Sequence, residues 1–322
     1  MALLLCGGWR LDQPEGRAEQ QRWLAALEQA LPGEEWILQS PADGAAAGRI
    51  DVAVVANPPP GSLQGLPALG LIQSLWAGVD RLLLDGTVPQ EPPLCRMVDP
   101  AMNEAMVQTA LWATLALHRG FFQCQRQQRE ALWRQPPQLR AAEWQVLVLG
   151  QGELGGRVGR ALAGLGYAVT GWSRRPRPSE ALQGRQGLHG ADGLAQGLAA
   201  ADTVINLLPL TDETRGFLDA RRLAAFKRGA SLINLARGAH LDEAALLAAL
   251  DSGQVGHAVL DVFQQEPLPA PHPFWRHERV TVLPHTAAQT DPRSAAEVVA
   301  ANVRAWRRGA PLLHRVERSQ GY

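Results

Sequence analysis

The sequence predicts an α/β fold of two domains, each built on a sheet of parallel strands, with the first domain discontinuous. Its 322 residues exceed what one hydrophobic core usually organises, so two domains are expected. Short apolar runs alternate with helical patterns along the chain, which is typical of parallel strands joined by helices. A glycine-rich turn near the middle follows one of these runs and indicates where a second sheet begins.

The first domain is predicted from its apolar runs and from an amphipathic helix around 18–30. Its four strands are expected at 2–6, 36–39, 51–55 and 71–75. A proline-rich break at 57–61 follows the third strand directly, so the chain turns there. From about residue 100 the pattern becomes a long apolar helix over 102–117, and a Gln- and Arg-rich continuation to Arg134 is expected as its exposed extension.

The second domain is predicted to begin with a strand at 145–149. Its further strands are expected at 167–172, 203–208, 230–235, 256–260 and 280–283. The segment 293–308 has helical periodicity and could return to the first domain. The first domain would then comprise 1–100 and 287–322, and the second would comprise 101–286.

The charge balance excludes several kinds of partner. The chain has 31 basic and 31 acidic residues, so no excess charge favours nucleic acid or an anionic membrane. Lys227 is the only lysine, which argues against Schiff-base and pyridoxal-phosphate chemistry. The sequence has no G-x-x-x-x-G-K-[ST] loop for a nucleoside triphosphate.

Cys6, Cys95 and Cys124 are isolated and odd in number, which indicates neither a disulfide framework nor a zinc site. A cytoplasmic location is therefore expected. Residues 1–6 lack the basic region and the length of an export signal and are interpreted as a buried strand. No apolar run approaches the ~20 residues of a membrane helix. The two histidines within 272–277 are typical of a loop, so no metal is expected.

The turn after the strand 145–149 carries the pattern G-x-G-x-x-G. It consists of Gly150, Gln151, Gly152, Glu153, Leu154 and Gly155. The pattern alone is weak, but a helical segment and a second apolar strand follow it, as in a dinucleotide-binding βαβ unit. The glycines would allow a tight turn, the approach of a pyrophosphate and close helix packing, and the helix N-terminus would bind the phosphates. The prediction is therefore two Rossmann-like or flavodoxin-like domains, the second binding a dinucleotide; a purely structural turn is the alternative.

The end of the second strand of this unit indicates which dinucleotide binds. An NAD enzyme places Asp or Glu there for the ribose 2′-hydroxyl. This chain instead has Ser173, followed by Arg174, Arg175 and Arg177. A hydroxyl and guanidinium groups suit a 2′-phosphate, which a carboxylate would repel. We expect NADP(H) to be preferred and NAD(H) to be possible, with a solvated basic loop as the alternative interpretation.

Three residues at the exits of predicted strands suit the reduction of a 2-oxo acid, because open α/β sheets build their sites there. Arg237 offers a planar fork for the substrate carboxylate. His285 has an ordinary pKa near working pH and suits proton donation to the carbonyl oxygen. Glu266 would stabilise the imidazolium, and Asp261 would face the nicotinamide carboxamide. Each residue alone has a plainer explanation as a surface ion pair, a loop residue or a cap, but the set in this order favours catalysis.

The first domain is expected to supply the opposite wall of the site. Trp76, Ala77, Gly78 and Val79 follow the strand 71–75. Their small side chains would leave backbone N–H groups for a carboxylate, and Trp76 could narrow the pocket. An ordinary turn is an equally good explanation of these residues.

Together these residues resemble the D-isomer-specific 2-hydroxyacid dehydrogenases, and within them the bacterial glyoxylate/hydroxypyruvate reductase A group. The resemblance covers nearly the whole chain. It rests on motifs at 77–80, 149–155, 172–174, 205–209, 234–238, 246–253, 260–263, 266–269, 284–285 and 321–322.

The resemblance implies a mobile substrate domain, a coenzyme domain, and a homodimer formed through the helical segment near 100–145. It also implies NADPH-dependent reduction of glyoxylate to glycolate and of hydroxypyruvate to D-glycerate. Arg237, Glu266 and His285 correspond to the family's catalytic arginine, acid and histidine. Further cofactor contacts are implied at Leu208, Pro209, Thr214, Ala236, Asp261 and Ala287.

Two departures from the group lie where substrate would bind. Trp76 stands where members usually carry a smaller residue, and Ala56-Asn57 replaces bulkier residues. The preference among glyoxylate, hydroxypyruvate and longer 2-oxo acids is therefore open. The alternatives are a broader dehydrogenase of longer 2-oxo acids and a non-catalytic dinucleotide sensor of the corepressor type. A formate-dehydrogenase-like enzyme fits poorly, because those relatives carry an amide in place of Glu266.

Overall fold

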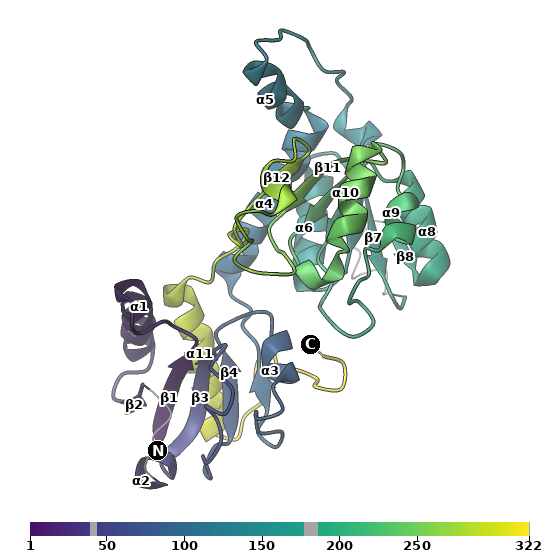
Figure 1. Cartoon of the computed structure of the whole chain (residues 1–322). Helices are drawn as coiled ribbons and strands as arrows, with labels where there is room; N and C mark the ends of the chain where they lie inside the picture. The colour runs from purple at the N-terminus through teal and green to yellow at the C-terminus, as the bar shows by residue number, and fades with distance from the viewer. Residues whose placement is uncertain (39–43, 177–185, 322) are drawn as a thin grey trace. The chain divides into compact units, whose positions relative to one another are not determined.

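The structure, a computed structural model, describes residues 1–38, 44–176 and 186–321. The chain forms two compact units (Figure 1): the first comprises Met1–Met102 and Thr290–Tyr322, and the second comprises Asn103–Gln289. Each unit contains one sheet, and the strand pairs of both sheets are parallel. The predicted α/β class with two parallel sheets is confirmed. Within the described ranges, no helix is both long enough and apolar enough to cross a membrane.

The sheet of the first unit has five strands in the order β2-β1-β3-β4-β5. They are β1 (Ala2–Gly7), β2 (Trp36–Ile37), β3 (Ile50–Ala56), β4 (Leu71–Ser74) and β5 (Leu94–Cys95). The strand order reverses between β1 and β3, the position at which open parallel sheets bind ligands. β2 ends at Ile37, before the predicted end, and residue 39 lies outside the described residues. β5 is too short for a sequence pattern to predict.

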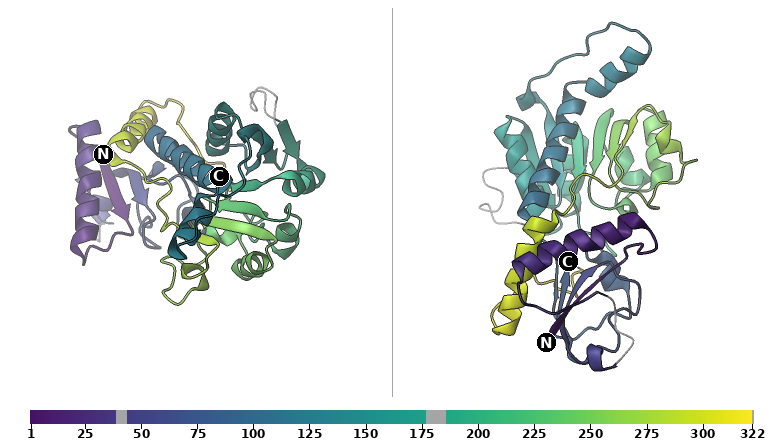
Figure 2. Two further views of the ribbon diagram at one scale, coloured as in Figure 1. Left: turned by 90° about the horizontal axis from the view of Figure 1, so that it is seen from above. Right: turned by 90° about the vertical axis from the view of Figure 1, so that its left-hand side faces the viewer.

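Helix α11 (Pro292–Arg307) lies in the first unit, so the C-terminal segment joins residues 1–102 there. It lies beside α1 (Pro14–Ala30), and apolar side chains of both helices share one buried cluster (Figure 2). Buried Asn302 of α11 donates a hydrogen bond to Gln73 of β4 (2.7 Å). The first unit is therefore discontinuous in sequence. Its remaining helices are α2 (Gly44–Ala47) and α3 (Asp80–Leu84).

The sheet of the second unit has seven strands in the order β12-β11-β10-β9-β6-β7-β8. They are β6 (Gln145–Leu149), β7 (Ala168–Ser173), β8 (Gln186–His189), β9 (Thr203–Asn206), β10 (Ala230–Asn234), β11 (Val255–Leu260) and β12 (Val280–Val282). The strand order reverses between β6 and β9, so the glycine-rich turn after β6 stands at the ligand-binding position of this sheet. β8 escapes prediction because its sequence, Gln-Gly-Leu-His, is not an apolar run.

Helices cover both faces of this sheet, and residues of β6 show how the core is divided. Leu147 and Leu149 belong to one buried cluster, whereas Val146 and Val148 belong to another, as the alternation of side chains along a strand requires. The helices are α6 (Glu153–Gly164), α8 (Gly190–Ala200), α9 (Ala220–Ala224) and α10 (Glu243–Asp251), with 3-10 turns η1 (Ala141–Glu143), η2 (Gly238–His240) and η3 (Pro273–Trp275).

The prediction that one helix continues as an exposed extension to Arg134 is wrong. Helix α4 (Pro100–His118) ends two residues before Gly120, whose φ of 69° is a left-handed conformation that stops a helix. A separate helix, α5 (Phe121–Arg129), follows, and it projects from the second unit together with the loop after it (Figure 1). Trp133 in that loop is 95% exposed.

Candidate functional site

The glycine-rich turn after β6 is shaped by its backbone. Gly150 has a φ of 92°, and a Cβ there would lie 2.8 Å from the carbonyl oxygen of Leu207. At Gly155 a Cβ would lie 1.9 Å from the carbonyl oxygen of Gly150, so α6 packs directly on the turn. Gly152, which precedes α6, has open space at its Cβ position. Two glycines are therefore needed by the protein itself, whereas the third leaves room next to a helix N-terminus, where phosphates bind.

The side chains between these glycines form hydrogen bonds, an ion pair and apolar contacts within the second unit. The amide of Gln151 donates to the carbonyl oxygens of Val148 and Gly150 (3.1 Å each). Glu153 forms an ion pair with Arg157 one turn later (2.6 Å), and Leu154 packs against the core. The loop therefore presents its backbone, rather than charged side chains, to a ligand.

The end of β7 lacks a carboxylate. Ser173, the last residue of the strand, donates its hydroxyl hydrogen to the carbonyl oxygen of Arg175 (2.7 Å). Arg174 forms an ion pair with Glu213, a contact that the sequence does not predict. Arg175 is exposed, and Arg177 lies outside the described residues.

A buried polar network that sequence reasoning misses joins the ends of β9 and β10. Asn206 of β9 donates to Asn234 of β10 (3.0 Å) and to Nδ1 of His240 (3.1 Å), and all three side chains are fully buried. Because Nδ1 accepts this bond, His240 carries its proton on Nε2 and donates it to the carbonyl oxygen of Pro209 (3.2 Å). The detectable signal is a repeated pattern, an asparagine after two apolar residues in each strand.

This network holds the loops that carry predicted cofactor and substrate residues. Asn206 accepts a hydrogen bond from the N–H of Leu208 (3.2 Å), and Asn234 accepts one from Ala236 (3.3 Å). Asn234 also donates to the carbonyl oxygen of Arg237 (3.2 Å). In the same region, the hydroxyl of Thr214 donates to the carbonyl oxygen of Pro209 (2.7 Å). Five predicted residues thus lie in the loops that follow two neighbouring strands, β9 and β10. They are Leu208, Pro209, Thr214, Ala236 and Arg237.

The structure brings Arg237, Glu266 and His285 together. Nδ1 of His285 lies 2.8 Å from a carboxylate oxygen of Glu266, whose other oxygen accepts the N–H of Phe263 (3.0 Å). Gly238 packs against the same segment, since a Cβ there would lie 1.9 Å from the carbonyl carbon of Phe263. This contact places Arg237 next to the Glu266 loop, although the two residues are 29 positions apart in sequence.

The pKa values of His285 and Glu266 are shifted in opposite directions. The hydrogen bond to Glu266 raises the pKa of His285 and outweighs burial, which lowers it. Burial raises the pKa of Glu266, but the hydrogen bonds from His285 and Phe263 outweigh it, so this pKa lies below its ordinary value. The positive charge of Arg237 lowers both pKa values. The arrangement favours a protonated imidazole beside an ionised carboxylate.

The backbone of His285 is held by buried Asp261. His285 has a φ of 53°, which is uncommon for a residue with a side chain, and its N–H donates to the carbonyl oxygen of Asp261 (2.9 Å). One oxygen of the Asp261 carboxylate accepts the N–H groups of Thr286 (2.7 Å) and Ala287 (3.0 Å). Burial raises the pKa of Asp261. The structure thus assigns Asp261 a role in positioning the histidine loop, which the sequence does not reveal.

The remaining predicted substrate residues lie in the first unit, after β4. The N–H of Trp76 is bonded to the hydroxyl of Ser74 (3.0 Å), and its ring packs edge-on against Trp23 (5.9 Å between centroids). The N–H groups of Ala77, Gly78 and Val79 donate to no described residue. Three backbone donors are therefore available in this segment.

The two histidines of the 272–277 segment bond to different carboxylates. Nε2 of His272 lies 3.4 Å from Glu243, and Nε2 of His277 lies 3.3 Å from Asp251. The described residues contain no cluster of side chains suited to a metal ion.

Comparisons with known proteins agree with this geometry. The family model of the D-isomer specific 2-hydroxyacid dehydrogenase NAD binding domain matches residues 111–287. Glyoxylate/hydroxypyruvate reductase A of Serratia proteamaculans is 41% identical over 294 residues, which cover 90% of this chain and 92% of that protein.

Solved structures agree along the whole chain. A D-isomer specific 2-hydroxyacid dehydrogenase from Xanthobacter autotrophicus, in complex with NADPH and MES, is 39% identical with a TM-score of 0.91, covering 100% of this chain and 99% of that one. An NADPH-dependent glyoxylate/hydroxypyruvate reductase from Sinorhizobium meliloti, in complex with NADP and sulfate, is 34% identical with a TM-score of 0.88 and the same coverage. The predicted family is confirmed: the chain belongs to the D-isomer specific 2-hydroxyacid dehydrogenases.

Proposed function

We propose that this protein reduces short 2-oxo acids with NADPH, converting glyoxylate to glycolate and hydroxypyruvate to D-glycerate. The observation that carries the proposal is the His285–Glu266 hydrogen bond of 2.8 Å beside Arg237, at the carboxyl ends of a dinucleotide-binding sheet. The names of the relatives from Serratia proteamaculans and Sinorhizobium meliloti support the same activity.

In this mechanism Arg237 binds the substrate carboxylate through its planar guanidinium group. His285 donates the proton on Nε2 to the carbonyl oxygen, because Nδ1 is engaged with Glu266. Glu266 stabilises the imidazolium and fixes its orientation. The turn Gly150–Gly155 and the loops at Leu208–Pro209, Ala236 and Ala287 would hold NADPH, which supplies the hydride when bound.

The cofactor assignment rests on the end of β7. Ser173 leaves no carboxylate to repel a 2′-phosphate, and Arg174 and Arg175 supply positive charge. Arg174 would exchange its ion pair with Glu213 for the phosphate. We expect the double variant S173D/R174A to lower the ratio of kcat/KM for NADPH over that for NADH. An unchanged ratio would show that this strand end does not select the cofactor.

The activity itself is tested by following NADPH and NADH oxidation with glyoxylate, hydroxypyruvate, pyruvate and phenylpyruvate. Turnover of glyoxylate and hydroxypyruvate is expected. Efficient turnover of phenylpyruvate would point instead to a broader dehydrogenase. Binding of the cofactor without oxidation by any acid would favour the non-catalytic sensor.

We also propose a homodimer formed through the segment near 100–145. The segment exposes large apolar side chains that the described part of the chain leaves uncovered: Trp112, Phe121, Leu132, Trp133 and Leu139. Isolated apolar residues are normal on surfaces, but a group of this kind on a projecting arm is typical of an interface. Light scattering is expected to give a dimer mass for the native chain and a smaller mass for W133S/F121S. A monomeric native chain would contradict the assignment.

We also propose a cytoplasmic location for the protein. Its three cysteines are free, with Cys6 and Cys95 buried and Cys124 exposed, and free thiols persist in a reducing compartment. Cell fractionation would test this location.

A further inference from the structure

The loop between β11 and β12 carries Glu266, and side chains rather than backbone pairs hold this part of it. Among the described residues, no backbone–backbone hydrogen bond involves residues 262–268. The N–H of Phe263 donates to Glu266 itself (3.0 Å), and the N–H of Gln264 donates to the carboxylate of Glu243 (3.0 Å). The position of the catalytic acid therefore depends on a second carboxylate, which lies outside the loop.

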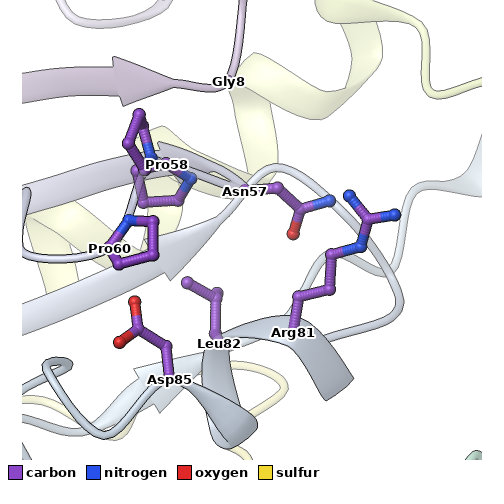
Figure 3. Close-up of a pocket in the computed structure, with 8 residues that line it drawn as sticks. Gly8, Asn57, Pro58, Pro60, Arg81, Leu82 and Asp85 are labelled. Atoms are coloured by element: carbon purple, nitrogen blue, oxygen red, sulfur yellow. The ribbon is translucent and has the colours of Figure 1, made fainter.

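The loop after β3 in the first unit shows a different way of fixing a loop. Asn57 is followed there by three prolines, and Figure 3 shows Pro58 and Pro60 lining a pocket together with residues of the α3 region. Proline fixes φ, so few conformations are available to that loop. Residues 262–266 contain no proline. Contacts with other segments must therefore hold the part of the β11–β12 loop that carries Glu266.

Glu243 is the first residue of α10 and joins two points of this loop. One of its carboxylate oxygens accepts the N–H of Gln264, and the other lies 3.4 Å from Nε2 of His272. Nδ1 of His272 accepts the N–H of Phe274 (3.3 Å), so the proton of the neutral ring is on Nε2 and faces Glu243. The Glu243 side chain is only 17% exposed. A shielded carboxylate thus bridges positions 264 and 272, with Glu266 between them.

The segment that leads from Arg237 to Glu243 lies along the same loop. Gly238 has no room for a side chain, since a Cβ there would lie 2.5 Å from the backbone nitrogen of Gln264. The side-chain amide of Gln264 donates to the carbonyl oxygen of Leu241 (2.7 Å). Gln264 is therefore fixed twice, through its backbone by Glu243 and through its side chain by Leu241. These contacts join the loop of the catalytic acid to the segment that begins with Arg237.

A second histidine–carboxylate pair, at the other end of α10, provides a comparison. Nε2 of His277 lies 3.3 Å from Asp251, the last residue of the helix, and Nδ1 of His277 accepts the N–H of Arg279 (3.1 Å). This bonding pattern is the same as that of His272 and Glu243. The Asp251 side chain, however, is 76% exposed, and among the described residues its carboxylate bonds to His277 alone. Only Glu243 adds a bond to the backbone beside the catalytic acid.

We propose that Glu243 is a positioning residue, which holds the loop of Glu266 so that this carboxylate bonds to His285. The N–H groups of two consecutive residues, 263 and 264, bind Glu266 and Glu243 respectively. Loss of the contact with Glu243 would therefore release the peptide group next to the one that Glu266 accepts. The inference rests on the proposed function, in which Glu266 stabilises the protonated form of His285.

A purely structural role is the competing explanation, because an acidic residue in the first turn of a helix also stabilises the helix dipole. That role predicts a loss of stability without a change in the pH dependence of the reaction. The charged groups that shift the pKa of His285 are Glu266, Asp261 and Arg237. Glu243 is not among them, so an effect of its substitution on this pKa must pass through the loop.

The test compares E243A with E243Q and with the control D251A. E243A removes the acceptor of the Gln264 N–H, so kcat/KM for glyoxylate reduction should fall by about 3- to 30-fold, because small displacements of catalytic groups slow reactions. The decline of kcat/KM with rising pH should also begin at lower pH, since a weaker bond to Glu266 raises the pKa of His285 less. E243Q keeps an oxygen acceptor, and D251A leaves the loop contact intact. Both should stay close to wild type in rate and in pH profile.

Fluorescence titration with NADPH serves as the folding control for all variants. If E243A does not bind NADPH, E243D takes its place, because it keeps the charge at the helix start but shortens the reach of the carboxylate. Its pH profile should move in the same direction. Three outcomes overturn the proposal: a wild-type pH profile in the folded variant, an equal change in D251A, or an equal change in E243Q.

If no 2-oxo acid is reduced, the proposed function fails, and NMR titration of the His285 imidazole decides the inference. The signal is identified by its absence in H285N. The pKa of His285 should be lower in E243A than in wild type and unchanged in D251A. A lowered pKa without turnover would support the positioning of Glu266 while refuting the reaction. An equal pKa in wild type and E243A would overturn the proposal whether or not the protein turns over an acid.

Discussion

The carboxyl edges of the two sheets follow the same topological rule but use their polar groups in opposite ways. In the second unit the buried side chains of Asn206, Asn234 and His240 bond to one another and to the neighbouring loops. In the first unit the oxygen of Asn57 has no partner among the described residues, and neither do the N–H groups of Ala77 to Val79. The buried polar side chains at the edge of the second sheet thus have hydrogen-bond partners within the protein. At the edge of the first sheet, the side-chain oxygen of Asn57 has none among the described residues.

This difference separates two ways of building a site. A hydrogen-bonded network holds loops rigidly, which suits hydride transfer because small misplacements of reacting groups slow it. Unpaired groups reduce stability but bind a ligand that supplies the missing partners. Substitutions in the hydrogen-bonded network should therefore lower stability, whereas substitutions of the unpaired groups should leave stability nearly unchanged.

The largest effect is expected at His285. H285N preserves a residue that tolerates the left-handed backbone but cannot donate a proton in the same way, so kcat for reduction should fall by about 10²- to 10⁴-fold. The measurement is steady-state NADPH oxidation, with fluorescence titration of NADPH as the control for folding. Activity within tenfold of wild type would remove His285 as the proton donor.

The network of the second unit should respond in stability. N206A leaves the N–H of Leu208 and Nδ1 of His240 without their partner, which should cost about 1–3 kcal/mol. For a unit of this size, each kcal/mol corresponds to roughly 2–4 °C in thermal midpoint. Circular dichroism on the unliganded protein would measure the shift. A midpoint equal to that of wild type would mean that the network does not stabilise these loops.

Substitution of Glu266 should change the pH dependence of the reduction. Because its hydrogen bond raises the pKa of His285, the protonated form persists to higher pH, and reduction slows only as pH rises through that raised pKa. E266Q removes the negative charge, so the pKa of His285 should fall and the decline should begin at lower pH. Profiles of kcat/KM for reduction over the stable pH range would show it. A decline that stays in place or moves to higher pH would contradict the coupling.

The smallest effect is expected from N57G on stability. The amide oxygen of Asn57 makes no bond within the described chain, and glycine accepts its backbone conformation, so the change should stay below about 0.5 kcal/mol. Thermal midpoints of N57G and N206A, recorded side by side, test the contrast directly. A loss at N57G as large as that at N206A would erase the distinction between the two edges.

Much of the fold could be predicted because its signals are local. An apolar run followed by a polar residue marks a strand exit, which is why the predicted positions of Arg237, Glu266 and His285 could be tied to one sheet edge. The helix break at Gly120 is not predictable from the sequence, because a single glycine is tolerated within many helices. The strand β5 is too short to produce a pattern.

Contacts between distant residues could not be predicted. Asn206 and His240 are 34 positions apart, and nothing in either neighbourhood specifies the other. The role of Asp261 in holding the histidine loop likewise depends on N–H groups 25 and 26 residues away. The unsatisfied oxygen of Asn57 is a property of its surroundings in space, so the sequence reveals only that an asparagine precedes three prolines.

The left-handed backbone at His285 has an evolutionary consequence. Asparagine and aspartate tolerate this conformation better than most other residues with side chains, and in the genetic code each is one base away from histidine. Under the proposed mechanism, a single point mutation would therefore abolish proton transfer while preserving the backbone of the loop. If the proposed role of His285 is correct, one base change would leave a folded protein that binds a dinucleotide but does not oxidise it.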